Sequence, residues 1–368
     1  MPDEKIYQLA LTLVPGLGDI SIKNLISYVG SAQRVFSMPP GKLAKVPGIG
    51  KKTAGNIKSL DLAKAEALYE RLQKDNIRLL FYTDTDYSVR LKNIYDAPAL
   101  LFAQGNMDLN HPRMLAVVGT RRATTHGKAF VRQFISDLAG MDVTIVSGLA
   151  YGIDIAAHKA ALENNLPTIG VMASGPDIIY PQLHSKYARQ MLNHGGLLTE
   201  YPPGTQLDPA RFPARNRIVA GLCDATLVVE SAAKGGAMIT AQLASGYNRE
   251  VFAVPGRWHD ELSAGCNMLI KNNTAQAITS AADLCYYMQW ESPETASEEK
   301  VAKQYRQEEF SQEEWTVIST IEATGSEMHI DELSWKSQIQ ISKLAGILLN
   351  LEFKGIVNAL PGKKYSLN

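Results

Sequence analysis

Cysteines, long apolar runs and net charge are all scarce in this sequence. It has three cysteines in 368 residues, none in a C-x-x-C pair, so a disulfide framework is not expected. No run of about 18 apolar residues occurs, and we therefore expect no membrane span. The N-terminus lacks a basic segment followed by an apolar one, so we expect no signal peptide and a cytoplasmic location.

Net charge is absent because 37 basic and 37 acidic residues cancel. A protein that bound nucleic acid over its whole surface would usually be basic, so any such contact must come from local patches. Lys and Arg are in excess in residues 1–60, and Glu is in excess in residues 291–314. The basic end could face phosphate groups, whereas the acidic stretch is typical of a solvated linker.

The length and the 45% of hydrophobic residues predict two or three globular domains. We expect a helical domain at residues 1–75, a core at 76–290 and a small domain at 311–368. The segment 291–310, rich in Glu, Ser, Gln and Lys, is predicted to be a flexible linker.

One five-residue phrase occurs twice in the first domain. Residues 14–18 (VPGLG) and 46–50 (VPGIG) are 32 residues apart, and each precedes a helical pattern. They resemble helix–hairpin–helix units, whose glycine hairpins expose backbone N–H groups to a DNA phosphate. We therefore expect an all-α, SAM-like domain, with a degenerate structural copy of the unit as the alternative. A secondary DNA contact would use Gly48, Gly50, Lys51 and Lys52.

Short apolar runs alternate with helical patterns between residues 113 and 290. The runs are at 115–118, 143–146, 168–172, 197–199, 225–229 and 251–254. Helices fit between them, for example at 128–139, 153–164 and 238–247. This alternation predicts an α/β core, a doubly wound Rossmann-like parallel sheet covered on both faces. Ligands of such sheets bind beyond the carboxyl ends of the strands.

The tail at 311–368 has helical periods at 315–321, 330–333 and 341–353. Two short extended pieces follow, at 356–359 and 365–367. Three helices and a hairpin in a domain of this size suggest a winged-helix-like fold.

The first strand-to-helix turn of the core contains Gly119, Thr120 and Arg121. Backbone N–H groups at such a turn can hold a phosphate, and the helix dipole favours the anion. Thr120 adds a hydroxyl, and Arg121 can donate two hydrogen bonds to phosphate oxygens. A tight turn whose arginine pairs with a local acid is an equal alternative.

The second turn, SGLAYGID at 147–154, supplies Ser147, Gly148 and Gly152. Its glycines allow backbone to approach a ligand closely. The G-x-G-x-x-G fingerprint is missing, so no dinucleotide cofactor is implied. Asp154 and His158 are four residues apart, and we expect a structural pair at the start of a helix.

The third segment, FPARNRIVAGL at 212–222, has two arginines before a predicted apolar helix. Cations at a helix start are unfavourable unless an anion also binds there, which favours a phosphate site. The candidates are Phe212, as a stacking or a core residue, with Arg215, Asn216 and Arg217.

The fourth turn contains Lys234, Gly235 and Gly236, with N–H donors and a point charge but without Walker A spacing. All four segments follow strands of one sheet, so we expect one anion-binding groove. Glu200 could act as a base, but orienting Arg215 or Arg217 is the favoured role. We find no nucleophile–base pair and no metal-ligand cluster, so neither catalytic residues, a metal nor a cofactor is expected.

Several long motifs together resemble the DNA-processing protein A family (DprA, also called Smf). They are VVGTRRATTHG at 117–127, SGLAYGID at 147–154, TEYPPG at 199–204, FPARNRIVAGL at 212–222, VVESAAKGGAMITA at 228–241 and REVFAVPG at 249–256. The resemblance covers about residues 80–290 and implies a single-stranded DNA-binding protein. Arg121, Arg215, Arg217 and Lys234 would line its DNA groove. The sequence departs from the family pattern at Tyr151, where a basic residue is common, and at Gly235, where serine is usual.

The resemblance further implies a homodimer that protects incoming single-stranded DNA and loads the RecA recombinase in natural transformation and recombination. Met268, Leu269 and Ile270 are our first choice for the dimer face. The alternative is a nucleotide phosphoribohydrolase-like Rossmann enzyme. It is disfavoured because position 243 is Leu where the motif of that group has a glutamate. A third possibility is an adaptor that acts through the tail domain.

Overall fold

The computed structural model describes residues 3–290, 310–324, 327–360 and 362–367. The chain forms two compact units, Met1–Pro293 and Glu294–Asn368, and each is described by itself. The predicted linker lies outside the described residues except for its last one, Phe310. In the described part of the chain, no helix has the length and apolar character needed to cross a membrane.

Six helices make up the N-terminal part of the first unit: α1 (Glu4–Thr12), α2 (Asp19–Val29), α3 (Ala32–Ser37), α4 (Pro40–Leu43), α5 (Lys51–Ser59) and α6 (Leu62–Lys74). The two predicted hairpins lie before α2 and α5, and both contain a left-handed glycine, Gly16 at φ 79° and Gly48 at φ 83°.

A reciprocal pair of hydrogen bonds joins the two helix–hairpin–helix units. The Asn24 side chain donates to the Pro47 carbonyl at 3.3 Å, and the Asn56 side chain donates to the Pro15 carbonyl at 3.0 Å. Donors and acceptors are each 32 residues apart, which is the spacing of the sequence repeat. The duplication is therefore present in the structure as well as in the sequence.

The core sheet has nine strands in the order β1-β2-β6-β5-β4-β3-β7-β8-β9. They are β1 (Ile77–Phe81), β2 (Leu100–Gln104), β3 (Met114–Val118), β4 (Thr144–Ser147), β5 (Thr168–Val171), β6 (Gly195–Thr199), β7 (Ala225–Val228), β8 (Glu250–Ala253) and β9 (Gln276–Ala277). The six predicted core strands are present within two residues at either end, and they pair in parallel.

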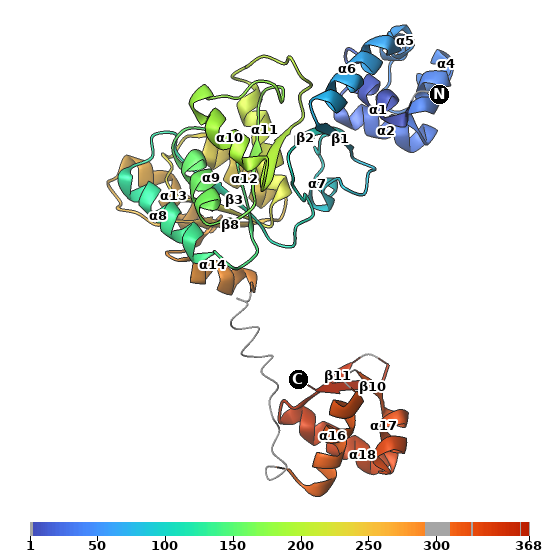
Figure 1. The fold of residues 1–368 in the computed structure, drawn as a ribbon, viewed down its shortest axis with the longest axis vertical. Coiled ribbons are helices and arrows are strands. Elements are labelled where there is room, and N and C mark those ends of the chain that lie inside the picture. The colour runs from blue at the N-terminus through green and yellow to red at the C-terminus, as the bar shows by residue number, and fades with distance from the viewer. Residues whose placement is uncertain (1–2, 291–309, 325–326, 361, 368) are drawn as a thin grey trace. The chain divides into compact units, whose positions relative to one another are not determined.

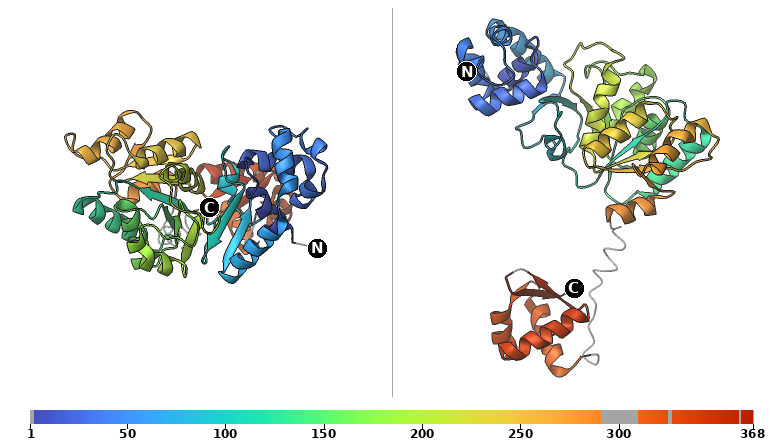
Figure 2. Two further views of the ribbon diagram at one scale, coloured as in Figure 1. Left: turned by 90° about the horizontal axis from the view of Figure 1, so that it is seen from above. Right: turned by 180° about the vertical axis from the view of Figure 1, so that it is seen from behind.

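Helices cover both faces of this sheet (Figures 1 and 2). One face packs against α8 (Thr125–Asp137), α9 (Ile153–Glu163), α10 (Ser185–Met191) and α14 (Ala281–Met288). The other packs against α7 (Val89–Lys92), α11 (Arg211–Leu222), α12 (Gly236–Gly246) and α13 (Ala264–Lys271). Short 3₁₀ turns lie at Gln182–His184 and Glu261–Ser263. Alternate residues of β3 face opposite layers, which confirms the doubly wound core.

The sheet extends beyond the parallel core, because β2 pairs antiparallel with β6 and β1 pairs antiparallel with β2. Three expectations need correction. Helix α11 begins at Arg211, before the two arginines, since Pro213 lies in its first turn, where N–H groups have no intrahelical acceptor. The His158 ring bonds to Thr168 rather than to Asp154. Leu269 is buried in the core and is not an exposed dimer-face residue.

The second unit contains α16 (Gln312–Thr324), β10 (Met328–His329), α17 (Ile330–Ser337), α18 (Ile341–Phe353), β11 (Val357–Leu360) and β12 (Lys364–Leu367). The three strands form a small antiparallel sheet, and the helices enclose an apolar cluster with it. This is the winged-helix arrangement that the sequence predicts, with β10 added.

Candidate nucleic-acid interface

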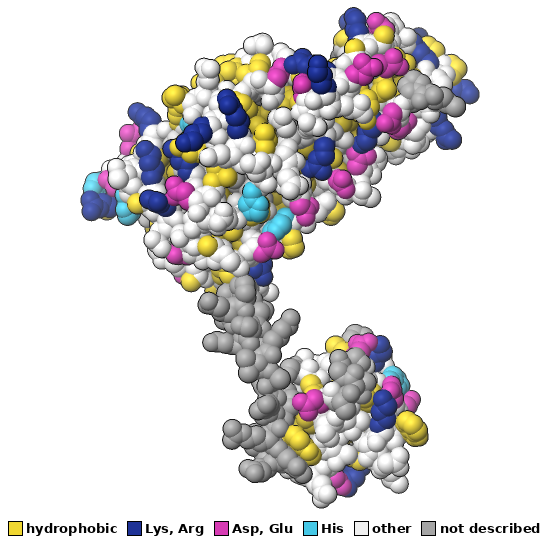
Figure 3. All heavy atoms as spheres, viewed as in Figure 1, with side chains coloured by type: hydrophobic (Ala, Val, Ile, Leu, Met, Phe, Trp, Pro, Cys, Tyr) yellow, Lys and Arg dark blue, Asp and Glu magenta, His cyan; other side chains and the backbone are white. Residues whose placement is uncertain are grey.

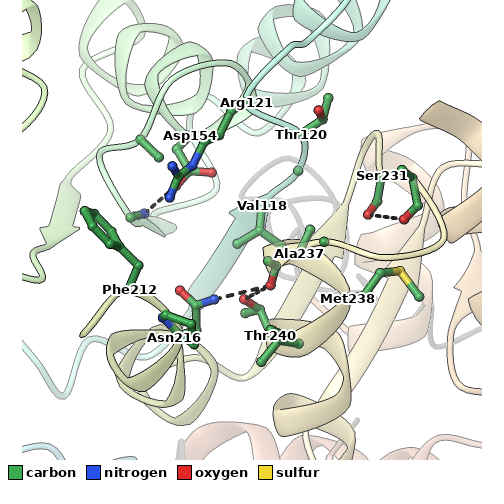
Figure 4. Close-up of a pocket in the computed structure, with 18 of the residues that line it drawn as sticks. Val118, Thr120, Arg121, Asp154, Phe212, Asn216, Ser231, Ala237, Met238 and Thr240 are labelled. Carbon is green, nitrogen blue, oxygen red and sulfur yellow. Dashed lines mark hydrogen bonds between the residues drawn. The ribbon is translucent and has the colours of Figure 1, made fainter. Parts of the chain in front are cut away.

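A groove of about 940 Å³ lies at the carboxyl ends of the core strands, where the strand order reverses. The turn after β3 forms one wall. Strand β3 pairs with β4 on one side and with β7 on the other. Across the groove, Arg121, Asp154 and Phe212 lie opposite Ser231 and Met238 (Figure 4). All four segments chosen from the sequence contribute to its lining.

Ten predicted site residues line this groove, and three do not. The ten are Gly119, Thr120, Arg121, Gly148, Phe212, Arg215, Asn216, Lys234, Gly235 and Gly236. The three outside it are Ser147, Gly152 and Arg217. Ser147 is buried and donates its hydroxyl to the Val117 carbonyl at 2.7 Å, so it supports the strands instead.

Arg121 is exposed at the mouth of the groove, with its guanidinium 5.2 Å from the centre of the Phe212 ring. None of the described acidic side chains forms an ion pair with it, so the predicted alternative of a local acid partner is not what the structure shows. Stacking on Phe212 leaves the guanidinium edge available to donate to an anion.

Aromatic rings surround this arginine. Phe212 is half-buried and lies 5.9 Å from the ring of Tyr180, which is 43% exposed. Tyr151, 41% exposed, lines the same small recess as Arg121. Exposed aromatic rings beside a cation are the combination that stacks bases and binds phosphates of single strands. Sequence reasoning missed Tyr180 because it lies in a loop with no motif of its own.

The start of α12 forms the opposite wall. The first-turn N–H groups of a helix have no intrahelical acceptors, and its N-cap, Gly235, has no side chain to cap them. Lys234 is exposed beside them, without an ion pair among the described residues. The Asn216 side chain donates to the Gly236 carbonyl at 3.2 Å and connects this wall to α11. The free N–H donors and the dipole of this helix start, with Lys234 next to them in the sequence, favour an anion at this wall.

Two glycines are required by close packing around the Arg121 turn. A Cβ on Gly152, at φ 80°, would lie 2.0 Å from the Thr120 carbonyl oxygen. A Cβ on Gly148 would lie 2.3 Å from the guanidinium of Arg215. Glycine at these two positions therefore allows the close packing that shapes the groove, and Gly148 also lines it.

Arg215 holds the floor of the groove together. Its side chain is 4% exposed, donates to the Gly148 carbonyl at 2.7 Å and also donates to the Val171 carbonyl. Burial lowers the pKa of Arg215 to about 10, opposed by the charge of Asp154. Burial raises the pKa of Asp154, although Arg215 and an N–H bond from Gly148 oppose that change. The pair fixes the turn after β4.

Arg217 points away from the groove. It forms an ion pair with Glu200, lies 3.5 Å from Asp19 of α2 and donates to the Asp96 carbonyl at 2.6 Å. Burial raises the pKa of Glu200 to about 6, and the charge of Arg217 opposes that rise. The favoured role of Glu200, orienting an arginine, therefore matches the geometry, and its partner is Arg217.

The secondary candidates lie in the second helix–hairpin–helix unit. Gly50 caps α5 without a side chain, and Lys51 and Lys52 are exposed at the first turn of that helix. Their contact with DNA stays a prediction. Among the described residues, no group of three His, Cys, Asp or Glu side chains is placed to hold a metal ion.

Comparison with known proteins identifies the chain. Residues 78–289 match the family model of DNA recombination-mediator protein A. The chain belongs to this family. Residues 307–363 match the DprA winged helix domain, and residues 9–64 match a SAM-like helix-hairpin-helix tandem.

Three relatives match between 58% and 98% of this chain. Protein Smf of Synechocystis sp. is 32% identical over 98% of both chains. The X-ray structure of DNA processing protein A from Streptococcus pneumoniae matches 79% of this chain and 99% of its own, with a TM-score of 0.69 and 34% identity. DNA processing protein A from Helicobacter pylori, studied for its single-stranded DNA binding mode, matches 58% of this chain and 95% of its own at a TM-score of 0.53 and 29% identity.

Proposed function

We propose that this DNA-processing protein binds single-stranded DNA in the groove at the carboxyl ends of β3, β4 and β7. The observation that supports this most directly is that Arg121 and Lys234 are exposed on opposite walls and have no acidic partner among the described residues. Phosphates would bind at Arg121, Lys234 and the first turn of α12. Bases would stack on Phe212, Tyr180 and Tyr151.

The groove favours a single strand over a duplex. Stacking on side chains requires unpaired bases, and it accepts any base because every base has a π-face. Binding should therefore have weak sequence preference and should weaken steeply with salt.

We also propose that the bound DNA is protected and passed to RecA in natural transformation and recombination, and that the protein acts as a homodimer in the cytoplasm. The family membership supports these steps. They are tested by RecA filament assembly on protein-coated single strands and by the molar mass in solution. A mass of one chain at all concentrations would refute the dimer.

We further propose that the groove is not catalytic. Glu200, the carboxylate considered for a hydrolase, lies outside the groove and is neutralised by Arg217. Position 243, where the motif of the phosphoribohydrolase group has a glutamate, is Leu on α12. Release of free base from AMP or CMP by the purified protein would contradict this proposal.

Fluorescence anisotropy with labelled oligonucleotides tests the binding proposal. Wild-type protein should bind a single strand more tightly than a duplex, and Arg121→Ala and Lys234→Ala should each weaken single-strand binding. Each substitution should lower the slope of log affinity against log salt by about 0.7. Lys271→Ala, an exposed lysine on α13, is the matched control. Equal binding of both DNA forms, unchanged by the groove variants, would refute the assignment.

A further inference from the structure

A second hollow, of about 480 Å³, adjoins the groove between α8 and α9. Arg121 and Arg122 line both cavities, so the two meet at the turn after β3. The hollow extends away from the strand ends along the outer surface of the two helices. Its lining residues from Lys128 onward on α8 and from Ile155 onward on α9 lie outside the motifs singled out in the sequence.

Its lining is strongly basic. Beyond the two shared arginines it contains Lys128, Arg132 and Lys159, against a single acidic residue, Glu163. Figure 3 shows several Lys and Arg side chains gathered over the region where α8, α9 and α10 lie in Figure 1. In a chain whose charges cancel, this excess is a local segregation of charge.

Most of these cations are available to an anion. Lys128 is exposed and has no ion-pair partner among the described residues. Arg132 pairs with Glu163 at 3.1 Å, but the two side chains are 75% and 52% exposed, and solvent weakens such an exposed pair. Lys159 lies 4.5 Å from the ring of Tyr187, which holds its ammonium group without neutralising it.

The floor of the hollow suits a backbone rather than a compact ligand. It is formed by small and apolar side chains of α9, namely Ile155, Ala156 and Ala160. The cations line the same hollow, and Tyr151 lines both the hollow and the small recess that contains Arg121. Several cations together with an aromatic ring are the combination that binds a flexible phosphodiester chain.

We propose that this hollow binds the phosphodiester backbone of the single strand where it leaves the groove, so that one strand crosses Arg121 and continues between α8 and α9. The inference rests on the proposed function, since it extends the path of the same strand. It predicts a binding footprint longer than the groove, with two parts that depend on different residues. Arg121 belongs to both parts, whereas Lys128 and Lys159 belong only to the second.

Oligonucleotide length separates the two parts. Oligo-dT of about six nucleotides should occupy the groove alone, and oligo-dT of about 20 nucleotides should reach the hollow. The Lys128→Gln/Lys159→Gln variant should bind the long strand about tenfold more weakly than wild type at about 0.1 M salt. Its slope of log affinity against log salt should fall by about 1.4. Its affinity for the short strand should equal that of wild type.

Two control proteins sharpen the comparison. Lys128→Arg/Lys159→Arg keeps both charges and should bind both strands as wild type does. Lys64→Gln/Lys74→Gln removes two exposed lysines of α6, away from the hollow, and should also bind as wild type does. Urea unfolding of each variant verifies that the fold is retained.

Other outcomes overturn the inference. Unchanged affinity of Lys128→Gln/Lys159→Gln for the long strand would show that the hollow binds no phosphate. An equal loss on both lengths would show that these lysines act on the groove itself, which refutes a separate second part. In both cases the proposed function would still hold if wild-type protein bound the single strands and Arg121→Ala weakened that binding. Wild-type protein that bound neither strand would refute both the inference and the proposed function.

Discussion

Replacing Arg217 by alanine should destabilise the protein without weakening the binding of single-stranded DNA by its folded form. Arg217 and Glu200 are only 14% and 12% exposed, and Arg217 also lies 3.5 Å from Asp19. The substitution removes the cation that both carboxylates face. Because Arg217 does not line the groove, the DNA contacts remain.

The expected loss follows from three contributions. With Arg217 present, the pKa of Glu200 is about 6. When Arg217 is removed, the Glu200 carboxylate can take up a proton at pH 7 instead of remaining charged without a partner, which costs about 1.4 kcal/mol. The hydrogen bond to the Asp96 carbonyl contributes about 1–1.5 kcal/mol, and the lost packing of the side chain about 1 kcal/mol. Together they predict a decrease of about 3 to 4 kcal/mol in the free energy of unfolding.

Urea unfolding at pH 7 and at pH 5.5, with DNA binding measured in parallel, tests this reasoning. The loss should be smaller at pH 5.5, because most Glu200 side chains are then already protonated. Arg121→Ala should behave in the opposite way, with unchanged stability and weaker binding. An Arg217→Ala protein of wild-type stability that binds DNA poorly would refute the placement of Arg217 outside the DNA site.

Two further substitutions test the fold around the site. Gly152→Ala should cost about 2 kcal/mol or more and should weaken single-strand binding, because its Cβ would displace the Thr120 carbonyl; Gly55→Ala, in α5 with open space around it, should be neutral or stabilising by up to about 1 kcal/mol in the same urea assay. Wild-type binding by Gly152→Ala would contradict the close packing of that turn. Burial raises the pKa of Glu200 from 4.5 to about 6, so the folded protein retains this proton to higher pH than the unfolded chain. The raised pKa of Glu200 therefore stabilises the fold by about 2 kcal/mol below pH 4.5, and this stabilisation is lost as the pH rises through 6. Glu200→Gln should remove this pH dependence from the urea midpoints. An identical pH profile for the variant would refute the prediction.

The parallel core was predictable because its signal is local. Each core strand is a short run of apolar residues buried on both faces, and the glycine turns follow the strands directly in the sequence. The antiparallel pairing of β2 with β6 joins segments almost 100 residues apart. No local pattern specifies such a partner.

The arginine segment shows where local reasoning failed. With α11 starting at Arg211, Arg215 and Arg217 lie two positions apart on a helix and so differ by about 200° around its axis. One side chain must therefore enter the floor of the groove while the other faces Glu200. From the sequence we expected the helix to start after both arginines. We therefore missed that the two side chains point in different directions and placed both in one site.

The zero net charge of the chain is compatible with a polyanion-binding groove because acidic side chains near the groove accept hydrogen bonds from the protein itself. Asp154 is buried and accepts a hydrogen bond from the Gly148 N–H at 3.1 Å. Glu230 accepts from the backbone N–H and the hydroxyl of Thr124 at the start of α8. Arg121 and Lys234 are therefore left exposed to solvent without a competing carboxylate. At physiological ionic strength charges beyond about 8 Å are largely screened, so this local excess, rather than the total, determines whether a phosphate chain binds.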